Sequence, residues 1–174
     1  MGIARDFPTA FAKAQAAAGA ELPRGGTAFI TVADRDKPAA TGLATFLHDL
    51  GFRIIATAGT AQAIRKMGIP AEAINKIGDG SPHVVDWIQR GDVDLVVNTP
   101  VGTGARTDGY EIRTAAISHG IPCITTIAGG IAAARAISAA RRGSSEAAGG
   151  PPVVSLQEIH QMGRQMPAAG PVSA

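Results

Sequence analysis

The pattern of apolar and polar positions divides the chain into short apolar runs joined by longer amphipathic stretches. Each run consists mostly of Val, Ile and Ala, which is typical of buried strands. The run at 95–98 is apolar up to its final Asn, as expected of a strand covered on both faces. The alternation predicts an α/β fold: a three-layer, doubly wound parallel sheet of about five strands flanked by helices, with right-handed crossovers. We expect the strands at residues 28–32, 52–56, 71–74, 95–98 and 122–125.

Glycine and proline residues mark the expected helix ends. Pro38 begins a helix that closes at Gly51, and Ser81-Pro82 resembles an N-cap with proline at the first helical position. Asp108 is expected to cap the helix that follows the fourth strand, and Gly129-Gly130 to precede an Ala-rich helix. The expected helices cover residues 38–50, 60–67, 83–90, 109–118 and about 131–141.

The two ends of the sequence differ from its centre. Residues 1–24 are expected to form a helical segment in which Phe7 and Phe11 face outward, so the isolated protein is a candidate for self-association. The α/β domain is predicted at 25–141, and a Gly-, Ser- and Pro-rich linker at 142–152. A strand and terminal helix are expected at 153–166, and a disordered tail at 167–174.

Composition excludes several classes of protein. Aromatic residues make up only 4% of the sequence and the net charge is +2, which disfavours a nucleic-acid surface. A single cysteine, Cys123, rules out a disulfide framework and a cysteine-rich metal site. No apolar run approaches the roughly 18 residues of a membrane span, and no hydrophobic leader opens the sequence. We therefore expect a cytoplasmic protein without a metal site.

Polar groups suited to a phosphate follow several predicted strands. The carboxyl ends of parallel strands meet at one edge of a sheet, so these groups should converge in a crevice there. They are hydroxyls, amides, ammonium groups and backbone N–H groups at a helix N-terminus. No nucleophile, metal cluster or base dyad accompanies them, so no catalytic residue is predicted. The predicted phosphate-binding residues are Lys37, Thr57, Gly59, Thr60, Lys76, Asn98 and Thr99.

Apart from Gly59, each of these residues also has a purely structural interpretation. The lysines could be solvated, the threonines could cap a helix, and Asn98 and Thr99 could satisfy turn N–H groups. Four further residues are weaker candidates for ligand contact or for relaying its effect. Arg106 lies in a Gly-rich loop that could act as a lid, Asp108 could touch a ribose hydroxyl or cap its helix, and Thr125 and Thr126 could line the base or ribose side.

Five motifs carry a resemblance to a known family. The sequence resembles the C-terminal, methylglyoxal-synthase-like regulatory domain of the carbamoyl-phosphate synthase large chain, from residue 1 to about residue 163. Residues 153–160 resemble the terminal signature of that family. The motifs are Val-Ala-Asp-Arg-Asp-Lys (32–37), Ala-Thr-Ala-Gly-Thr (56–60), Asn-Lys-Ile (75–77), Val-Val-Asn-Thr-Pro (96–100) and Thr-Thr-Ile-Ala-Gly-Gly (125–130).

The resemblance implies an effector-binding domain at 25–141 that binds nucleotide monophosphates, typically UMP as inhibitor and IMP as activator. Ornithine acts near its junction with the synthetase body. The parent large chain makes carbamoyl phosphate from bicarbonate, glutamine and ATP for pyrimidine and arginine synthesis. It would use ATP with Mg2+, with K+ as a further candidate, outside these residues. The implied partners are the synthetase domains and the glutaminase small chain. Pro100 stands where family members often carry a hydroxyl.

The rival interpretation is a free-standing methylglyoxal synthase, a lyase acting on dihydroxyacetone phosphate. That reaction needs a carboxylate base and an imidazole inside the phosphate pocket. Ala33 stands where the first-strand histidine would be, and the loop expected to hold the base is Gly80-Ser81-Pro82, with Asp79 nearby. A purine-pathway cyclohydrolase domain shares the fold and phosphate cradle but fits the C-terminal region less well. The regulatory domain is therefore the preferred interpretation.

Overall fold

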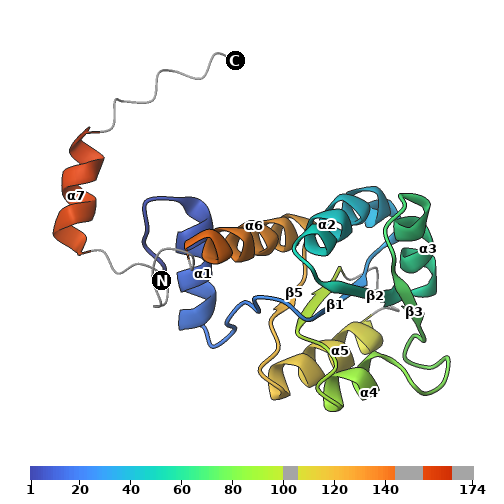
Figure 1. Ribbon diagram of the computed structural model, residues 1–174. Helices are drawn as coiled ribbons and strands as arrows, with labels where there is room; N and C mark the ends of the chain where they lie inside the picture. The colour runs from blue at the N-terminus through green and yellow to red at the C-terminus, as the bar shows by residue number, and fades with distance from the viewer. Residues whose placement is uncertain (100–105, 144–154, 166–174) are drawn as a thin grey trace.

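A computed structural model of the protein describes residues 1–99, 106–143 and 155–165 (Figure 1). Five parallel strands form one sheet in the order β3-β2-β1-β4-β5. The order reverses at β1, whose neighbours are β2 and β4, so the sheet is doubly wound as predicted. The strands are β1 (Thr27–Thr31), β2 (Arg53–Thr57), β3 (Glu72–Ile74), β4 (Leu95–Asn98) and β5 (Cys123–Ile124).

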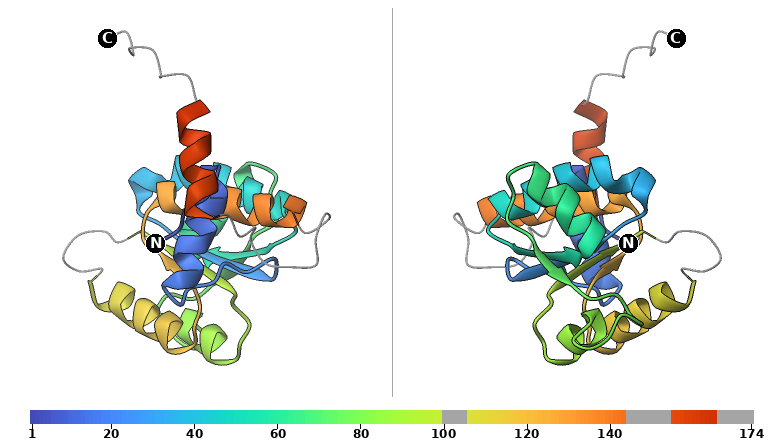
Figure 2. Two further views of the ribbon diagram at one scale, coloured as in Figure 1. Left: turned by 90° about the vertical axis from the view of Figure 1, so that its left-hand side faces the viewer. Right: turned by 90° about the vertical axis from the view of Figure 1, so that its right-hand side faces the viewer.

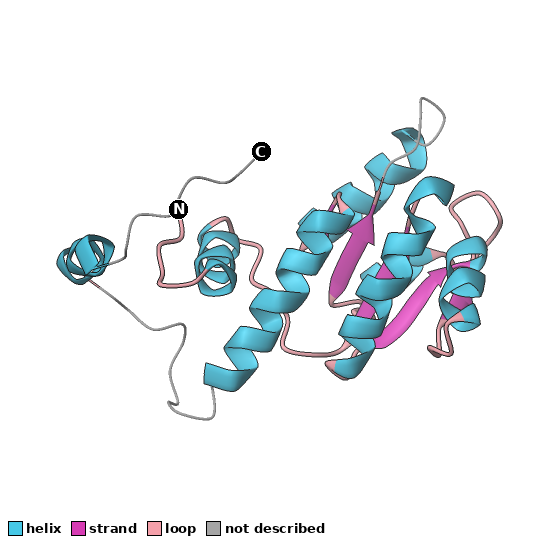
Figure 3. Ribbon diagram, turned by 90° about the horizontal axis from the view of Figure 1, so that it is seen from above, coloured by secondary structure: helices cyan, strands magenta, loops and turns pink. Residues whose placement is uncertain are grey.

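Helices cover both faces of this sheet and complete the three layers (Figures 1 and 3). One face carries α2 (Lys37–Asp49), α3 (Ala58–Lys66) and α6 (Ile127–Gly143). The opposite face carries α4 (Val84–Gln89) and α5 (Arg106–Ser118). The predicted fold class is confirmed.

Alternating residues of each strand supply two separate cores. Ala28 and Ile30 of β1 pack under α2, α3 and α6, whereas Phe29 between them packs under α4 and α5. All three side chains are fully buried. Because both faces are covered, the strand runs are continuously apolar rather than alternating, as the sequence indicated for β4.

The two terminal helices lie outside the sheet layers (Figures 1 and 2). In α1 (Phe7–Ala17), Asp6 caps the first turn and the helix packs against α6. The side chain of Phe7 is 62% exposed, and its ring centroid lies 5.8 Å from that of Phe11. The helix α7 (Leu156–Gln165) stands apart from the sheet, and its first residue is exposed. The predicted linker, the strand at 153–154 and the tail fall almost wholly outside the described residues.

Three expected helix starts are wrong. The helix α4 begins at Val84 with His83 as its N-cap, so Ser81 does not cap it as expected. The Asp86 carboxylate fixes this start by accepting hydrogen bonds from Ser81 Oγ (2.7 Å) and His83 N (2.8 Å). The helix α5 begins at Arg106, so Asp108 lies within its first turn rather than capping it.

The third wrong start is that of α6, which contains the glycines expected to precede it. A methyl group on Gly130 would come within 2.6 Å of a Leu43 methyl, so this glycine allows α6 to approach α2 closely.

No helix among the described residues is both long and apolar enough to cross a membrane.

Candidate anion-binding pocket

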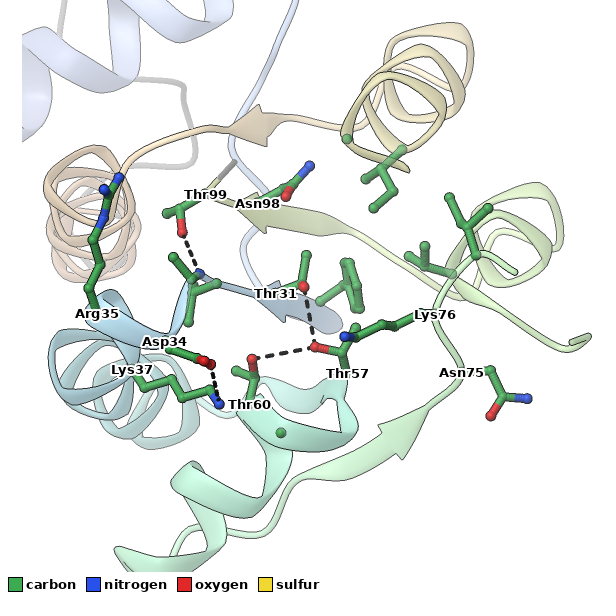
Figure 4. Close-up of a pocket in the computed structure, with 18 residues that line it drawn as sticks. Thr31, Asp34, Arg35, Lys37, Thr57, Thr60, Asn75, Lys76, Asn98 and Thr99 are labelled. Carbon is green, nitrogen blue, oxygen red and sulfur yellow. Dashed lines mark hydrogen bonds and ion pairs between the residues drawn. The ribbon is translucent and has the colours of Figure 1, made fainter. Parts of the chain in front are cut away.

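A cavity of about 430 Å3 opens at the carboxyl ends of β1, β2, β3 and β4 (Figure 4). This is the edge at which parallel sheets bind ligands. The structure brings all seven predicted phosphate-binding residues together in its lining: Lys37, Thr57, Gly59, Thr60, Lys76, Asn98 and Thr99.

A row of threonine hydroxyls crosses the floor of the pocket. The hydroxyl oxygen of Thr57 lies 3.2 Å from that of Thr31 and 3.4 Å from that of Thr60. Thr57 and Thr60 are buried, at 7% and 2% exposure. Although Thr57 holds the N-cap position of α3, its side chain makes no capping hydrogen bond. The first-turn N–H groups of α3 therefore remain available to an anion.

Lys37 brings a positive charge to the same place. A short 3-10 turn (Asp34–Asp36) leads from β1 to Lys37 at the start of α2. Its Nζ lies 2.6 Å from the Asp34 carboxylate, and a methyl group on Gly59 would lie 3.1 Å from the same nitrogen. The ammonium group thus stands directly over the first turn of α3, close to the exposed N–H groups.

Lys76 approaches from the other side of the pocket, from the segment that follows β3. Its side chain extends toward Thr57 in Figure 4. The hydrogen bond and charge of Lys37 hold the pKa of Asp34 below its usual value, and the charge of Lys76 acts in the same direction. The ammonium groups of Lys37 and Lys76 therefore both act on the Asp34 carboxylate, at the rim of the pocket.

The two residues at the end of β4 differ in what they can offer a ligand. The Thr99 hydroxyl accepts from Ala33 N (3.1 Å) and donates to the Asp36 carboxylate (3.0 Å). The single hydroxyl proton of Thr99 is therefore already donated, and the side chain links the turn between β1 and α2 to the end of β4. Asn98 is 5% exposed, and its Nδ2 has no hydrogen-bond partner among the described residues. An unsatisfied buried donor of this kind is suited to an acceptor on a ligand.

The structure does not place any of the four weaker candidates in the described lining of the pocket. Arg106 and Asp108 lie in the first turn of α5, and their side chains are outside the part of the protein that the structure describes. Thr125 and Thr126 are exposed and are not part of the described lining of the pocket. The hydroxyl of Thr126 accepts from Gly129 N at 3.0 Å and so serves the start of α6.

The sequence reasoning missed part of the lining. Thr31 is the last residue of β1 and pairs in register with Asn98, so the rule that selected other strand ends could have found it. Arg35 also lines the pocket; it lies in the motif Val-Ala-Asp-Arg-Asp-Lys, whose pattern does not single it out. The lining also has an apolar wall, formed by Phe29, Val32, Ile77, Val84 and Ile112. No sequence pattern distinguishes these residues from the rest of the hydrophobic core, in which they also pack.

The lining suits binding better than proton transfer. Among the described lining residues there is no histidine, and the one carboxylate belongs to Asp34, which is paired with Lys37. No cluster of metal-ligating side chains occurs within the described ranges. The pocket therefore combines cationic and hydroxyl groups with an apolar wall, which matches an anionic group attached to a less polar body.

Comparison with known proteins gives consistent results. The family model of the MGS-like domain matches residues 39–125. The carbamoyl phosphate synthase large chain of Rubrobacter xylanophilus is 50% identical over 160 residues, which cover 92% of this sequence and 15% of that protein. The corresponding protein of Micrococcus luteus is 50% identical over 179 residues, covering 100% of this sequence and 16% of its own length.

Two further matches are shorter or more distant. In Methanopyrus kandleri, the protein described as the C-terminal section of the carbamoyl phosphate synthase large chain is 53% identical over 79% of this sequence and 26% of its own length. A crystal structure of methylglyoxal synthase from Elizabethkingia anophelis NUHP1 aligns with a TM-score of 0.47 and 18% identity, over 63% of this protein and 77% of that one. The present sequence thus spans about a sixth of the length of the first two relatives.

Proposed function

The protein belongs to the MGS-like domain family, and from this premise we propose that it is the allosteric domain of a carbamoyl phosphate synthase large chain. Its ligand is a nucleoside monophosphate of the UMP or IMP type. The observation that carries the proposal is the meeting of Lys37 with the hydroxyls of Thr57 and Thr60 at the uncapped start of α3. These groups suit a phosphate dianion.

The rest of the pocket supports a nucleoside attached to that phosphate. The Nδ2 of Asn98, which has no hydrogen-bond partner among the described residues, could donate to a ribose or base oxygen, and the apolar wall offers packing area to a ring. Inorganic phosphate would use only the floor of the pocket. A monophosphate nucleotide would use the floor and the wall together, so it should bind more tightly.

The proposed role in the parent protein is control of carbamoyl phosphate synthesis from glutamine, bicarbonate and ATP, which feeds pyrimidine and arginine formation. We propose that this region supplies no catalytic group, and that ATP with Mg2+ acts in the remainder of the large chain. The synthetase domains and the glutaminase small chain are its proposed partners, and the cytoplasm its compartment. An effector can change the parent's activity only by its differential affinity for two arrangements, typically ~1–3 kcal/mol.

The lyase alternative lacks support in the pocket. Removing a proton next to a carbonyl needs a free base within hydrogen-bond reach of the substrate. The Asp34 carboxylate is ion-paired at the rim, and no histidine occurs among the described lining residues. Adding dihydroxyacetone phosphate to the purified protein and measuring methylglyoxal tests this directly: production above background would favour the lyase.

The proposed function is tested by calorimetric titration of UMP and IMP into the protein. A double variant, Lys37→Ala with Thr60→Val, removes one charge and one hydroxyl from the pocket. Its matched control, Lys66→Ala with Thr45→Val, removes the same groups from the end of α3 and from α2. We expect binding to be lost in the first and kept in the second. Equal affinity in both variants would contradict the assigned pocket.

A further inference from the structure

The ammonium group of Lys37 already holds an anion of the protein's own. Its Nζ lies 2.6 Å from Asp34 Oδ1, while the same nitrogen faces the first turn of α3, where Gly59 leaves room for it. Figure 4 shows Asp34 and Lys37 joined beside Thr60, at the rim of the pocket. The carboxylate and a ligand phosphate would therefore meet the same cation.

We propose that Asp34 is a built-in competitor that occupies Lys37 while the pocket is empty and that the ligand phosphate must displace. This inference rests on the proposed function, because it concerns regulation of affinity at the same pocket. It assigns Asp34 the opposite role to that of a positioning residue, which would hold Lys37 ready for the ligand.

The exposure of the Asp34 side chain and its negative charge both favour its displacement from Lys37 by a ligand phosphate. The Asp34 side chain is 93% exposed, so it can rotate into water, whereas the Lys37 side chain is only 29% exposed and is held toward the pocket. A carboxylate that stayed beside a bound phosphate would face a like charge at close range, which is unfavourable. Asp34 therefore leaves when the dianion arrives.

The electrostatics of the rim agree with this geometry. The pKa of Asp34 is lowered first by its hydrogen bond to Lys37, then by the charge of Lys37, with a smaller contribution from Lys76. The carboxylate thus lies in the field of both cations proposed to hold the phosphate. Without a bound ligand, the negative charge of Asp34 offsets part of the positive charge of Lys37 and Lys76, which a ligand phosphate would otherwise offset.

The experiment compares Asp34→Asn with the wild-type protein by titration with inorganic phosphate, UMP and IMP at low ionic strength. Asp49→Asn is the control, because it removes the same charge at the far end of α2, on an exposed residue. We expect Asp34→Asn to lower the Kd of each phosphate-bearing ligand roughly twofold to fivefold, as befits an exposed ion pair. The control should leave each Kd unchanged.

A second background tests whether the effect passes through Lys37. In a Lys37→Met protein, adding Asp34→Asn should no longer tighten phosphate binding. Weaker ligand binding by Asp34→Asn would mean that Asp34 positions Lys37 for the ligand. An equal gain in affinity in the Lys37→Met background would mean that Asp34 acts only as a long-range negative charge. Either result overturns the proposal. If the wild type binds and Asp34→Asn binds no better, only the competitor is excluded. If the wild-type protein binds none of UMP, IMP and phosphate, the proposed function itself fails.

Discussion

A methyl group on the α-carbon of Gly59 would lie 3.1 Å from the Nζ atom of Lys37. Gly59 is the second residue of α3, where alanine is a better helix former. We therefore expect Gly59→Ala to raise the free energy of unfolding by up to about 1 kcal/mol, because the unfolded state loses conformational freedom. The same methyl group displaces Lys37 and narrows the approach to the α3 N–H groups, so phosphate affinity should fall. Denaturant titration and calorimetry measure the two effects separately.

Gly42 provides the matched control for this substitution. It lies within α2, and a methyl group there would meet no atom within 4 Å. Gly42→Ala should stabilise the fold by about 0.4–1 kcal/mol and leave ligand binding unchanged. Equal binding by the Gly59 and Gly42 variants would mean that the space beside Lys37 is not used by the ligand.

The central hydroxyl of the threonine row gives the second prediction. Thr57→Val keeps the shape of the side chain and removes the oxygen that lies near both Thr31 and Thr60. We expect a loss of stability of about 1 kcal/mol, because neutral hydrogen bonds contribute little net free energy. The loss in nucleotide affinity should be about tenfold or more, since a hydrogen bond to a charged group is stronger. Calorimetry with UMP checks this, with Thr45→Val on α2 as the control.

A third prediction concerns the entry to β1. Gly26 has a φ of +109°, and a methyl group there would overlap the Asp94 carboxylate, which accepts a hydrogen bond from Thr27 N at 2.7 Å. Gly26→Ala therefore adds a clash to the backbone strain and should lower the free energy of unfolding by about 1–3 kcal/mol. Gly19→Ala shares a positive φ (+75°) but meets no atom within 4 Å, so it measures the strain alone. Urea unfolding of both variants should show the larger loss for Gly26; equal losses would mean that Asp94 moves aside freely.

The strand ends could be predicted because two simple rules agree there. Parallel strands bring their carboxyl ends to one edge, and the residues at the ends of β2 and β4 change abruptly from apolar to polar. Thr57, Thr60 and Asn98 were found in this way, and the structure brings them into one pocket. The same rules would have found Thr31, which ends β1 as a polar residue after a buried run.

Helix starts were harder to predict, because several local signals compete for the same N–H groups. Ser81-Pro82 has the composition of a helix start, but the Asp86 carboxylate fixes His83 as the cap. Gly130 looks like a break in sequence, yet it lies inside α6 because Leu43 leaves no space for a side chain there. The engagement of Thr99 with Asp36 joins residues 63 positions apart, and no local pattern could reveal it.

The last prediction concerns pH and the start of α4. The carboxylate of Asp86 accepts hydrogen bonds from His83 N and Ser81 Oγ, and these bonds hold its pKa below the ordinary value of 3.8. A group whose pKa is lower in the folded state stabilises the fold above its unfolded pKa and loses that contribution as pH falls through its folded pKa. Asp86→Asn should therefore lower the melting temperature at pH 7, because an amide oxygen accepts hydrogen bonds more weakly than a carboxylate.

The difference in melting temperature between wild type and Asp86→Asn should shrink below about pH 4, as the wild-type carboxylate becomes protonated. The other acidic groups titrate in both proteins, so their contributions cancel in this comparison. Asp92→Asn, on an exposed residue that follows α4, controls for the change in net charge. A difference that persisted undiminished to pH 2 would show that shape rather than charge makes Asp86 important. The start of α4 would then depend on packing around Asp86 rather than on the charge of its carboxylate.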